Sequence, residues 1–378
     1  MRNYVLPDNA YVSRLSPAIR YRLILESECA AAPLRRYAAS TVEKFTQEIY
    51  WRRYWKNWLS LRPQVWTAYL DKLAFIRNEI QYETCRNRAA ACEAGEGSIA
   101  IMNHFARELV QTGYLHNHAR MWFAGWWIHI ERLPWQLGAD FFFRHLLDGD
   151  PASNTLSWRW VAGLQTPGKT YLPRRSNLEK YLPAEVLQKY DKGLCLLENP
   201  HPLILPAENV AVITRLSLPL APPVSEFKLG IWIHEEDLFI EESPLAALKP
   251  CAILASGDAA TWTRFRYPNT KTDWLRSALT DTAKRAGSAF GIEAQFHIES
   301  NLINVLLKWA ADHHLQQIAA MRPEIGPLHD QIENLQIMLK KSGIDLVLLD
   351  RAEDLAQRPL ATGGFFGYWE KVQKTLTS

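Results

Sequence analysis

The stretch DGDPASNTLSWRW, residues 148–160, brings two carboxylates, an amide and two tryptophans together in the sequence. Its DGDP start suits an ordinary loop, and the pair of aspartates also suits a cation, although the spacing does not match an EF-hand. If Asp148 is buried it needs a cationic partner, for which Arg120 is a candidate. The residues alone leave a loop, a cation site and a ligand site open.

Three segments upstream carry polar and aromatic residues at helical positions. GYLHNHARM, residues 113–121, places a histidine, an asparagine and an arginine within one turn. In QEIYWRRYW, residues 47–55, a carboxylate, two indoles and a guanidinium share one helical face. That face suits a flat polar group such as a base, or simply an amphipathic helix with an ion pair. In YVSRLSP, residues 11–17, two serines either cap the following helix or help to bind a phosphate.

Length and composition indicate a soluble protein of two domains. A chain of 378 residues is long for one hydrophobic core, and 48% hydrophobic with 22% charged residues is typical of globular proteins. The apolar run Trp122–Ile130 is about half of the roughly 20 residues that span a bilayer, so we expect a buried helix there and no membrane segment. The start of the chain lacks a secretory pattern, and the five cysteines lack metal-binding spacing, which favours reduced thiols in the cytoplasm.

Arginines and tryptophans are unevenly distributed along the chain. The net charge of +3 is too small to indicate nucleic-acid binding by itself, but arginines crowd into residues 14–53. They form either a solvated helical face or a phosphate-binding surface. Most of the 15 tryptophans precede residue 161, which predicts either a bulky core or stacking surfaces for flat ligands.

The apolar pattern changes along the chain from helical to alternating strand and helix. Helices are expected over VEKFTQEIYWRRYWKNWL, capped at Ser40-Thr41, and over Ile99–Gly113, His116–Ile130 and Leu137–Leu147. Residues 198–226 are rich in proline and predict a linker around a short strand at Val210–Thr214. Strands are then expected at 228–233, 251–255, 294–298, 317–320 and 344–349, and helices at 273–286, 301–313 and 327–342. This alternation predicts a parallel sheet with helices on both faces.

Taken together, the four segments resemble the FAD domain of the photolyase/cryptochrome family in order and approximate spacing. The likeness covers residues 11–181 and implies an all-α FAD-binding domain. Residues 322–351 and 363–372 resemble parts of that family's α/β (Rossmann-like) antenna domain, which there precedes the FAD domain and here follows it. This implies a circular permutation, with an unrelated α/β domain as the alternative. The expected division is a helical FAD-binding domain at 1–197, a linker at 198–226 and an antenna-like domain at 227–378.

The resemblance also implies roles for individual residues. The residues that would bind FAD are Ser13, Leu15 and Ser16 at its phosphates, with Arg52, Arg120, Asp148, Asp150 and Asn154, the last at flavin N5. The residues that would contact a flipped-out DNA lesion are Glu48, Trp51, Arg52, Asn117 and Trp160. Trp158 and Trp135 would pass electrons to the flavin, and the outermost member of that chain is left unassigned.

The function that the resemblance implies is light-driven repair of cyclobutane pyrimidine dimers by a deoxyribodipyrimidine photolyase-like lyase. Reduced FAD, excited by blue or near-UV light, would donate an electron to the dimer. We expect a monomer that acts on damaged DNA without a metal; the sequence leaves open whether an antenna chromophore also binds. Leu115–Asn117 looks like the cyclobutane-dimer class, whereas Val12 and Asn103 depart from the family pattern. The alternatives are a cryptochrome-like FAD photoreceptor, or a redox flavoprotein without repair or photoactivity.

Overall fold

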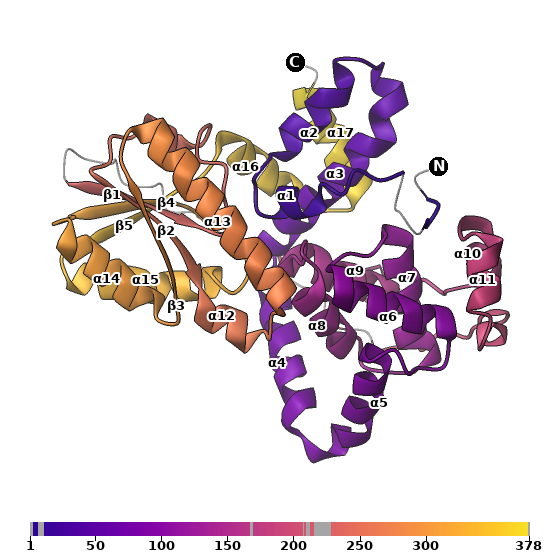
Figure 1. Cartoon of the computed structure of the whole chain (residues 1–378). Helices are drawn as coiled ribbons and strands as arrows, with labels where there is room; N and C mark the ends of the chain where they lie inside the picture. The colour runs from indigo at the N-terminus through magenta and orange to yellow at the C-terminus, as the bar shows by residue number, and fades with distance from the viewer. Residues whose placement is uncertain are drawn as a thin grey trace. The chain divides into compact units, whose positions relative to one another are not determined.

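The computed structural model describes residues 3–6, 11–166, 169–206, 208, 212–214 and 228–376. Close contacts divide the chain into two compact units. Unit 1 contains Met1–Ser16 and Gln64–Ala211, and unit 2 contains Pro17–Pro63 and Val212–Ser378. Figure 1 shows unit 1 as a set of helices and unit 2 as a sheet with helices around it.

The described part of unit 1 is helical, as expected. Its helices are α4 (Gln64–Asn78), α5 (Glu83–Glu93), α6 (Ala100–Thr112), α7 (Asn117–Gly125), α8 (Trp135–His145), α9 (Pro151–Val161), α10 (Arg175–Tyr181) and α11 (Ala184–Lys189), with short helical turns η1 (Ile80–Tyr82) and η3 (Leu194–Leu197). The helix expected over His116–Ile130 is α7 followed by the π-helical turn η2 (Trp126–Ile130). Helix α9 begins with Pro151, whose missing N–H costs nothing at that position.

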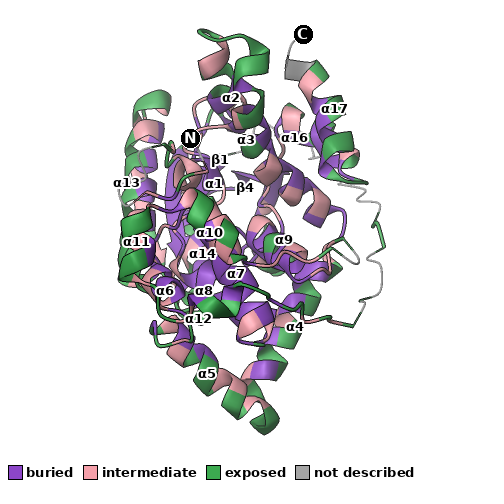
Figure 2. Cartoon of the chain, turned by 90° about the vertical axis from the view of Figure 1, so that its right-hand side faces the viewer, coloured by how far each residue is buried: buried purple, intermediate pink, exposed green. Residues whose placement is uncertain are grey.

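Tryptophans fill the core of unit 1. The side chains of Trp122, Trp126, Trp127 and Trp158 are almost fully buried, so at these positions the bulky-core interpretation is confirmed. Gly138 in α8 allows the close packing, because a Cβ atom there would lie 2.3 Å from Trp158 Cη2. Figure 2 shows α8 as mostly buried, in agreement with the burial of every residue from Trp135 to Arg144.

Unit 2 contains a five-stranded parallel sheet in the order β3-β2-β1-β4-β5. The strands are β1 (Leu229–His234), β2 (Ala252–Asp258), β3 (Ala294–Glu299), β4 (Gln317–Met321) and β5 (Asp345–Leu349), which confirms the five strands predicted from the sequence. The helices between them are α12 (Ala259–Arg264), α13 (Asn269–Phe290), α14 (Leu302–Asp312) and α15 (His329–Lys341), with the turn η4 (Pro244–Ala247).

Alternating strand residues build two hydrophobic layers, one on each face of the sheet. Ile231 and Ile233 pack with α13 on one face, whereas Trp232 and Leu254 pack with α14 and α15 on the other. Figure 1 shows α13 on one side of the sheet and α14 and α15 on the opposite side. The predicted parallel sheet with helices on both faces is therefore confirmed.

The segment Pro17–Pro63 belongs to unit 2, which differs from the expected boundary near residue 197. It forms α1 (Ser16–Arg20), α2 (Glu26–Leu34) and the long α3 (Ala39–Ser60), and α3 packs against α17 (Phe365–Leu376). The turns α16 (Ala352–Gln357) and η5 (Arg358–Leu360) precede α17. The predicted cap at Ser40-Thr41 is wrong, because α3 begins at Ala39 and its N-cap, Ala38, makes no side-chain bond.

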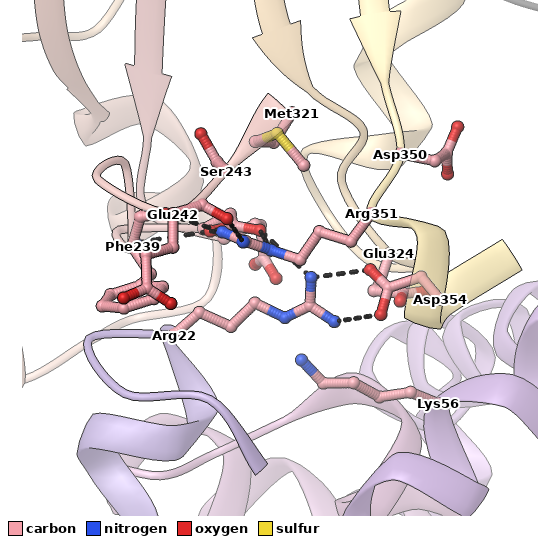
Figure 3. A network of polar contacts seen from close by, with 12 residues as sticks. Arg22, Lys56, Phe239, Glu242, Ser243, Met321, Glu324, Asp350, Arg351 and Asp354 are labelled. Atoms are coloured by element: carbon pink, nitrogen blue, oxygen red, sulfur yellow. Dashed lines mark hydrogen bonds and ion pairs between the residues drawn. The ribbon is translucent and has the colours of Figure 1, made fainter. Parts of the chain in front are cut away.

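A buried ion network joins this segment to the sheet (Figure 3). Arg22 donates to Asp354 at 2.7 and 2.8 Å and to Asp237 at 3.1 Å. Arg351 donates to both carboxylate oxygens of Asp237, at 2.7 and 3.1 Å. Burial opposes the charge of Glu324, but Arg53, at 3.2 Å, and further cations lower the pKa of Glu324 to about 2.

The network lies at the carboxyl ends of the strands. Asp237 follows β1, Glu324 follows β4 and Arg351 follows β5. In open parallel sheets this edge is the usual place for a ligand, at the point where the strand order reverses. At this edge Arg22, from the N-terminal segment, pairs with the carboxylates of Asp237 and Asp354.

The described residues contain no helix that is long and apolar enough to cross a bilayer. They contain no cluster of metal-ligating side chains. The strand expected at Val210–Thr214 lies partly outside the described residues, and residues 212–214 are not in a strand.

Candidate functional site

The loop of residues 11–16 in unit 1 has an unusual backbone at Arg14. Its φ angle of 56° lies in the left-handed region, which costs a side-chain-bearing residue free energy and is often found at ligand sites. The N–H of Leu15 lies 3.5 Å from Ser13 Oγ, and Ser16 is the first residue of α1. The two serine hydroxyls and the loop N–H groups are suitable donors for a phosphate.

Two guanidinium groups flank the ring of Tyr114. The Cζ atom of Arg14 lies 5.3 Å from the ring centroid, and that of Arg120 lies 5.7 Å from it. Burial raises the pKa of the Tyr114 hydroxyl, while Arg120 opposes the shift, so the ring is neutral at pH 7. The loop of residues 13–16 and the start of α7 therefore share a positively charged neighbourhood.

Arg120 is held in place by two hydrogen bonds. Its Nε donates to the carbonyl of Leu115 at 2.9 Å, and its Nη1 donates to Asp148 Oδ2 at 3.0 Å. The pairing of Arg120 with Asp148 that the sequence predicts is thus confirmed. Asp148 is buried and Arg120 is partly exposed, so the guanidinium side of the ion pair is partly accessible.

Asp150 and Asn154 organise the start of α9. Asp150 Oδ1 accepts from the N–H of Ser153 at 2.8 Å and from its hydroxyl at 3.1 Å, which caps the helix. One turn later, Asn154 Nδ2 donates to the carbonyl of Ala139 in α8 at 2.7 Å. Both side chains are fixed by hydrogen bonds within unit 1.

The N-terminus of α7 presents Asn117 to solvent. His116 caps the helix through Nδ1, which accepts from the N–H of His118 at 3.1 Å, and His116 itself is buried. Asn117, the first helical residue, is exposed. The predicted group of His116, Asn117 and Arg120 therefore separates into a structural cap and two residues that are at least partly exposed.

The three tryptophans singled out from the sequence differ in their surroundings. Trp158 is buried and packs edge-on against Trp127, with ring centroids 6.3 Å apart. Trp135 stacks on Tyr69, with centroids 5.6 Å apart and an interplanar angle of 23°. Trp160 is partly exposed, and its ring centroid lies 5.6 Å from that of Tyr171.

Tyr69 is a contact that the sequence analysis missed. It is buried and lies between Trp135 and Trp66, whose ring centroid is 5.4 Å away. Tyr69 thus stacks on Trp135 of α8 and lies tilted by 35° against Trp66, its neighbour on α4. The spacing of Trp66 and Tyr69 along one helical face was the available signal, but many aromatic pairs in this chain have helical spacing.

In unit 2, one face of α3 is at least partly accessible to solvent. Glu48 is exposed, and Trp51, Arg52 and Trp55 are partly exposed, so the shared face predicted from the sequence is confirmed. Phe365 of α17 stacks on Trp51 with centroids 3.8 Å apart and an interplanar angle of 12°. One ring face of Trp51 is therefore covered, which the sequence did not indicate because the two residues are far apart along the chain.

Comparison with known proteins identifies the helical part of the chain. Residues 45–194 match the model of the FAD binding domain of DNA photolyase. Over this segment the chain is similar to the photolyase/cryptochrome family. The match begins inside α3, so the family domain includes residues of both compact units.

Several curated relatives are named deoxyribodipyrimidine photo-lyase. The protein from Streptomyces griseus is 28% identical over 155 residues, which are 41% of this chain and 32% of the relative. The one from Synechococcus is 27% identical over 238 residues, 59% of this chain and 46% of the relative. A solved class III photolyase from Agrobacterium tumefaciens is 26% identical in sequence. The match covers 48% of this chain and 38% of the photolyase chain, and its TM-score is 0.38. The matches thus span less than half of these relatives.

The residues in unit 1 fit the FAD that this family domain binds. The hydroxyls of Ser13 and Ser16 and the guanidinium of Arg14 suit the diphosphate, because they are neutral or cationic donors beside a left-handed turn. Arg120 and Asp148 supply a donor and an acceptor for the polar atoms of a flavin or ribityl chain. The aromatic cluster around Trp158 is buried in the core of unit 1.

Proposed function

We propose that the protein repairs cyclobutane pyrimidine dimers in DNA by a light-dependent reaction that uses FAD. The observation that carries the proposal is the fixed Arg120–Asp148 pair. Asp148 is close in sequence to Asp150, which caps α9, and to Asn154, and all four residues lie within the segment that matches the FAD-binding family. When bound and reduced, FAD supplies a light-driven electron to the substrate. The protein supplies binding, orientation and electrostatics.

The proposed FAD-binding residues are Ser13, Leu15, Ser16, Arg52, Arg120, Asp148, Asp150 and Asn154. Arg120 and Asp148 would fix polar atoms of the cofactor because their own pair is held by the Leu115 carbonyl. Asn154, anchored through Nδ2, would present its oxygen to the flavin. Trp158 and Trp135, both buried, would relay electrons from an external donor to the cofactor.

The proposed lesion-binding residues are Glu48, Trp51, Arg52, Asn117 and Trp160. Each of these five residues is exposed or partly exposed. For Trp51 and Trp160 this is unusual, because tryptophan side chains are usually buried. Flat bases stack on exposed indoles, and Glu48 and Asn117 supply hydrogen-bonding groups for base edges. Their accessibility supports a role toward a substrate rather than in the core.

We further propose that residues 1–197 supply the FAD-binding domain, with residues 17–63 packed in unit 2, and that residues 227–378 form an antenna-like α/β domain in permuted order, joined by the linker at 198–226. The five-stranded parallel sheet supports the second part of this division. The Arg22 network fills only the part of the carboxyl edge of that sheet that adjoins Asp237 and Asp354.

The second candidate function is that of a cryptochrome-like photoreceptor without repair activity. One observation favours it: Phe365 covers a ring face of Trp51, which reduces the aromatic surface left for a lesion. The two functions differ in their products, because only repair restores intact pyrimidines.

The discriminating experiment is a repair assay on an oligonucleotide that contains one thymine dimer. The purified protein, reduced with dithionite, is incubated with the DNA under near-UV light and in the dark. Recovery of absorbance at 260 nm only in the light supports repair. Retention of bound FAD without any recovery in the light supports the photoreceptor instead.

A further inference from the structure

Phe366 is an exposed aromatic residue next to the aromatic face of α3. Its side chain is 69% exposed, although it lies in the first turn of α17 directly after the buried Phe365. Its ring lies edge-on to Trp51, with centroids 6.4 Å apart. A phenylalanine left in water forgoes the favourable burial of its ring, so its position calls for an explanation.

The backbone that carries Phe366 is firmly held. Tyr54 donates its hydroxyl to the carbonyl of Gly363 at 2.8 Å. Arg62 donates to the carbonyls of Thr362 at 2.8 Å and Ala361 at 3.2 Å. The start of α17 is thereby fixed to the end of α3, and Phe366 is exposed on a pre-organised backbone rather than on a loose terminus.

Glycines leave the space around Phe366 open. Gly364 and Gly367 flank the Phe365-Phe366 pair, and a Cβ atom built on either would meet no atom within 4 Å. No side chain of these neighbours therefore covers the ring. A flat group could approach Phe366 at the place where its edge meets Trp51.

If Trp51 is to bind a base, it needs Phe366 as a second aromatic contact for that base. Phe365 stacks on one face of Trp51, which leaves the other face and the ring edge. The remaining aromatic surface is shared by Trp51, Trp55 and Phe366, since Trp55 lies 5.4 Å from Trp51. Aromatic side chains grouped in this way are typical platforms for nucleobases.

We propose that Phe366 stacks on a nucleobase of the DNA strand beside the lesion and so extends the α3 face as a positioning residue. This rests on the proposed function, because it needs DNA as the substrate. The occupant is a base rather than an aliphatic partner, because the accessible surface consists of aromatic rings, with the polar groups of Glu48 and Arg52 on the same face of α3.

The test compares Phe366→Ala, Phe366→Leu and Phe366→Trp in binding to a fluorescent oligonucleotide with one thymine dimer. Loss of one stacked base, about 1–3 kcal/mol, weakens binding roughly 5- to 150-fold in the alanine variant. The leucine variant, apolar but without a flat ring, should also bind weakly, whereas the tryptophan variant should bind like the wild type. The matched control is Phe75→Ala, because Phe75 is a 42% exposed phenylalanine on α4.

A spectroscopic measurement separates stacking from a change of fold. With 2-aminopurine placed next to the dimer, stacking on Phe366 quenches its fluorescence in the wild-type complex, and the quenching is lost in Phe366→Ala. Wild-type affinity or quenching in Phe366→Ala or Phe366→Leu would overturn the inference while leaving the proposed function intact. If the wild type itself does not prefer dimer-containing DNA, the proposed function and this inference both fail. If the wild-type protein is a dimer of two chains and Phe366→Ala converts it to a monomer, the patch is instead a self-association surface, and the base contact is overturned.

Discussion

Arg22 and Asp354 lie 332 positions apart in the sequence and form a buried, two-pronged ion pair, with N–O distances of 2.7 and 2.8 Å. The pair joins the N-terminal segment to the helix that follows the last strand of the sheet. Arg53 also pairs with Asp354, so one carboxylate serves two buried guanidinium groups. Residues 17–63 are therefore an integral part of unit 2.

Asp354→Ala should lower the free energy of unfolding by about 3–5 kcal/mol. The substitution removes the carboxylate that Arg22 and Arg53 share and leaves Asp237 and Glu324 as the ion-pair partners of these buried cations. Breaking a buried ion pair is far more costly than the loss of a surface pair. Urea denaturation followed by tryptophan fluorescence measures the change. The matched control is Asp312→Ala, which breaks the exposed Lys308–Asp312 pair and should cost under about 1 kcal/mol. Equal effects of the two variants would contradict the role of the network.

Glu235→Gln should stabilise the protein at pH 8 but not at pH 4.5. Burial, aided by the charge of Glu236, raises the pKa of Glu235 to about 7 from its ordinary 4.5. The stability associated with its protonated form is therefore present below pH 4.5 and is lost as the pH rises through 7. Glutamine stays neutral and keeps an oxygen to accept from Trp262 Nε1, now at 2.8 Å. We expect a gain of roughly 1–3 kcal/mol at pH 8.

The measurement for Glu235→Gln is the unfolding free energy at both pH values. Glu370→Gln, at an exposed position of α17, is the control for removing a carboxylate charge. A Glu235→Gln variant that is destabilised equally at both pH values would show that packing, not ionisation, governs this position.

Most elements of the fold could be predicted, because they depend on local patterns. The five strands, among them β1 with Trp232 and β2 with Leu254, were evident from short apolar runs with helices between them. The pairing of Arg120 with Asp148 was also predictable, since a buried carboxylate needs a nearby cation. These inferences need only neighbours in sequence or one complementary charge.

The association of residues 17–63 with the sheet was not predictable. It depends on contacts such as Arg22–Asp354 and Trp51–Phe365, whose partners are separated by most of the chain. Periodicity shows which face of α3 is apolar or charged, but it does not say which distant segment covers that face. The same limit applies to Phe366, whose exposure depends on how α17 meets α3.

Asp148→Ala should reduce FAD retention while the helical unit stays folded. The substitution removes the acceptor that orients Arg120, so the guanidinium loses its fixed position toward the cofactor. Because Arg120 is partly exposed, we expect a stability cost of only about 1–3 kcal/mol. Flavin content after gel filtration, with circular dichroism of the same sample, checks both parts. Full flavin retention in this variant would remove Asp148 and Arg120 from the proposed site.

Trp158→Phe and Trp160→Ala should affect different steps. Phenylalanine keeps an apolar ring at the buried position but is a far poorer electron donor, so bleaching of oxidised flavin under blue light with an external donor should slow strongly. Repair by chemically reduced protein should persist. Trp160→Ala should keep photobleaching and lose about 1–3 kcal/mol of lesion affinity. Normal bleaching in Trp158→Phe would indicate that another ring, such as the adjacent Trp127, carries the electron.

The central claim is that this chain holds FAD, and the flavin content of the purified protein tests it most directly. Absorbance between 300 and 550 nm is recorded, the protein is denatured, and the released cofactor is identified by chromatography against FAD and FMN. The account predicts a yellow protein that releases an equimolar amount of FAD. A folded but colourless protein that takes up no FAD on reconstitution would contradict it.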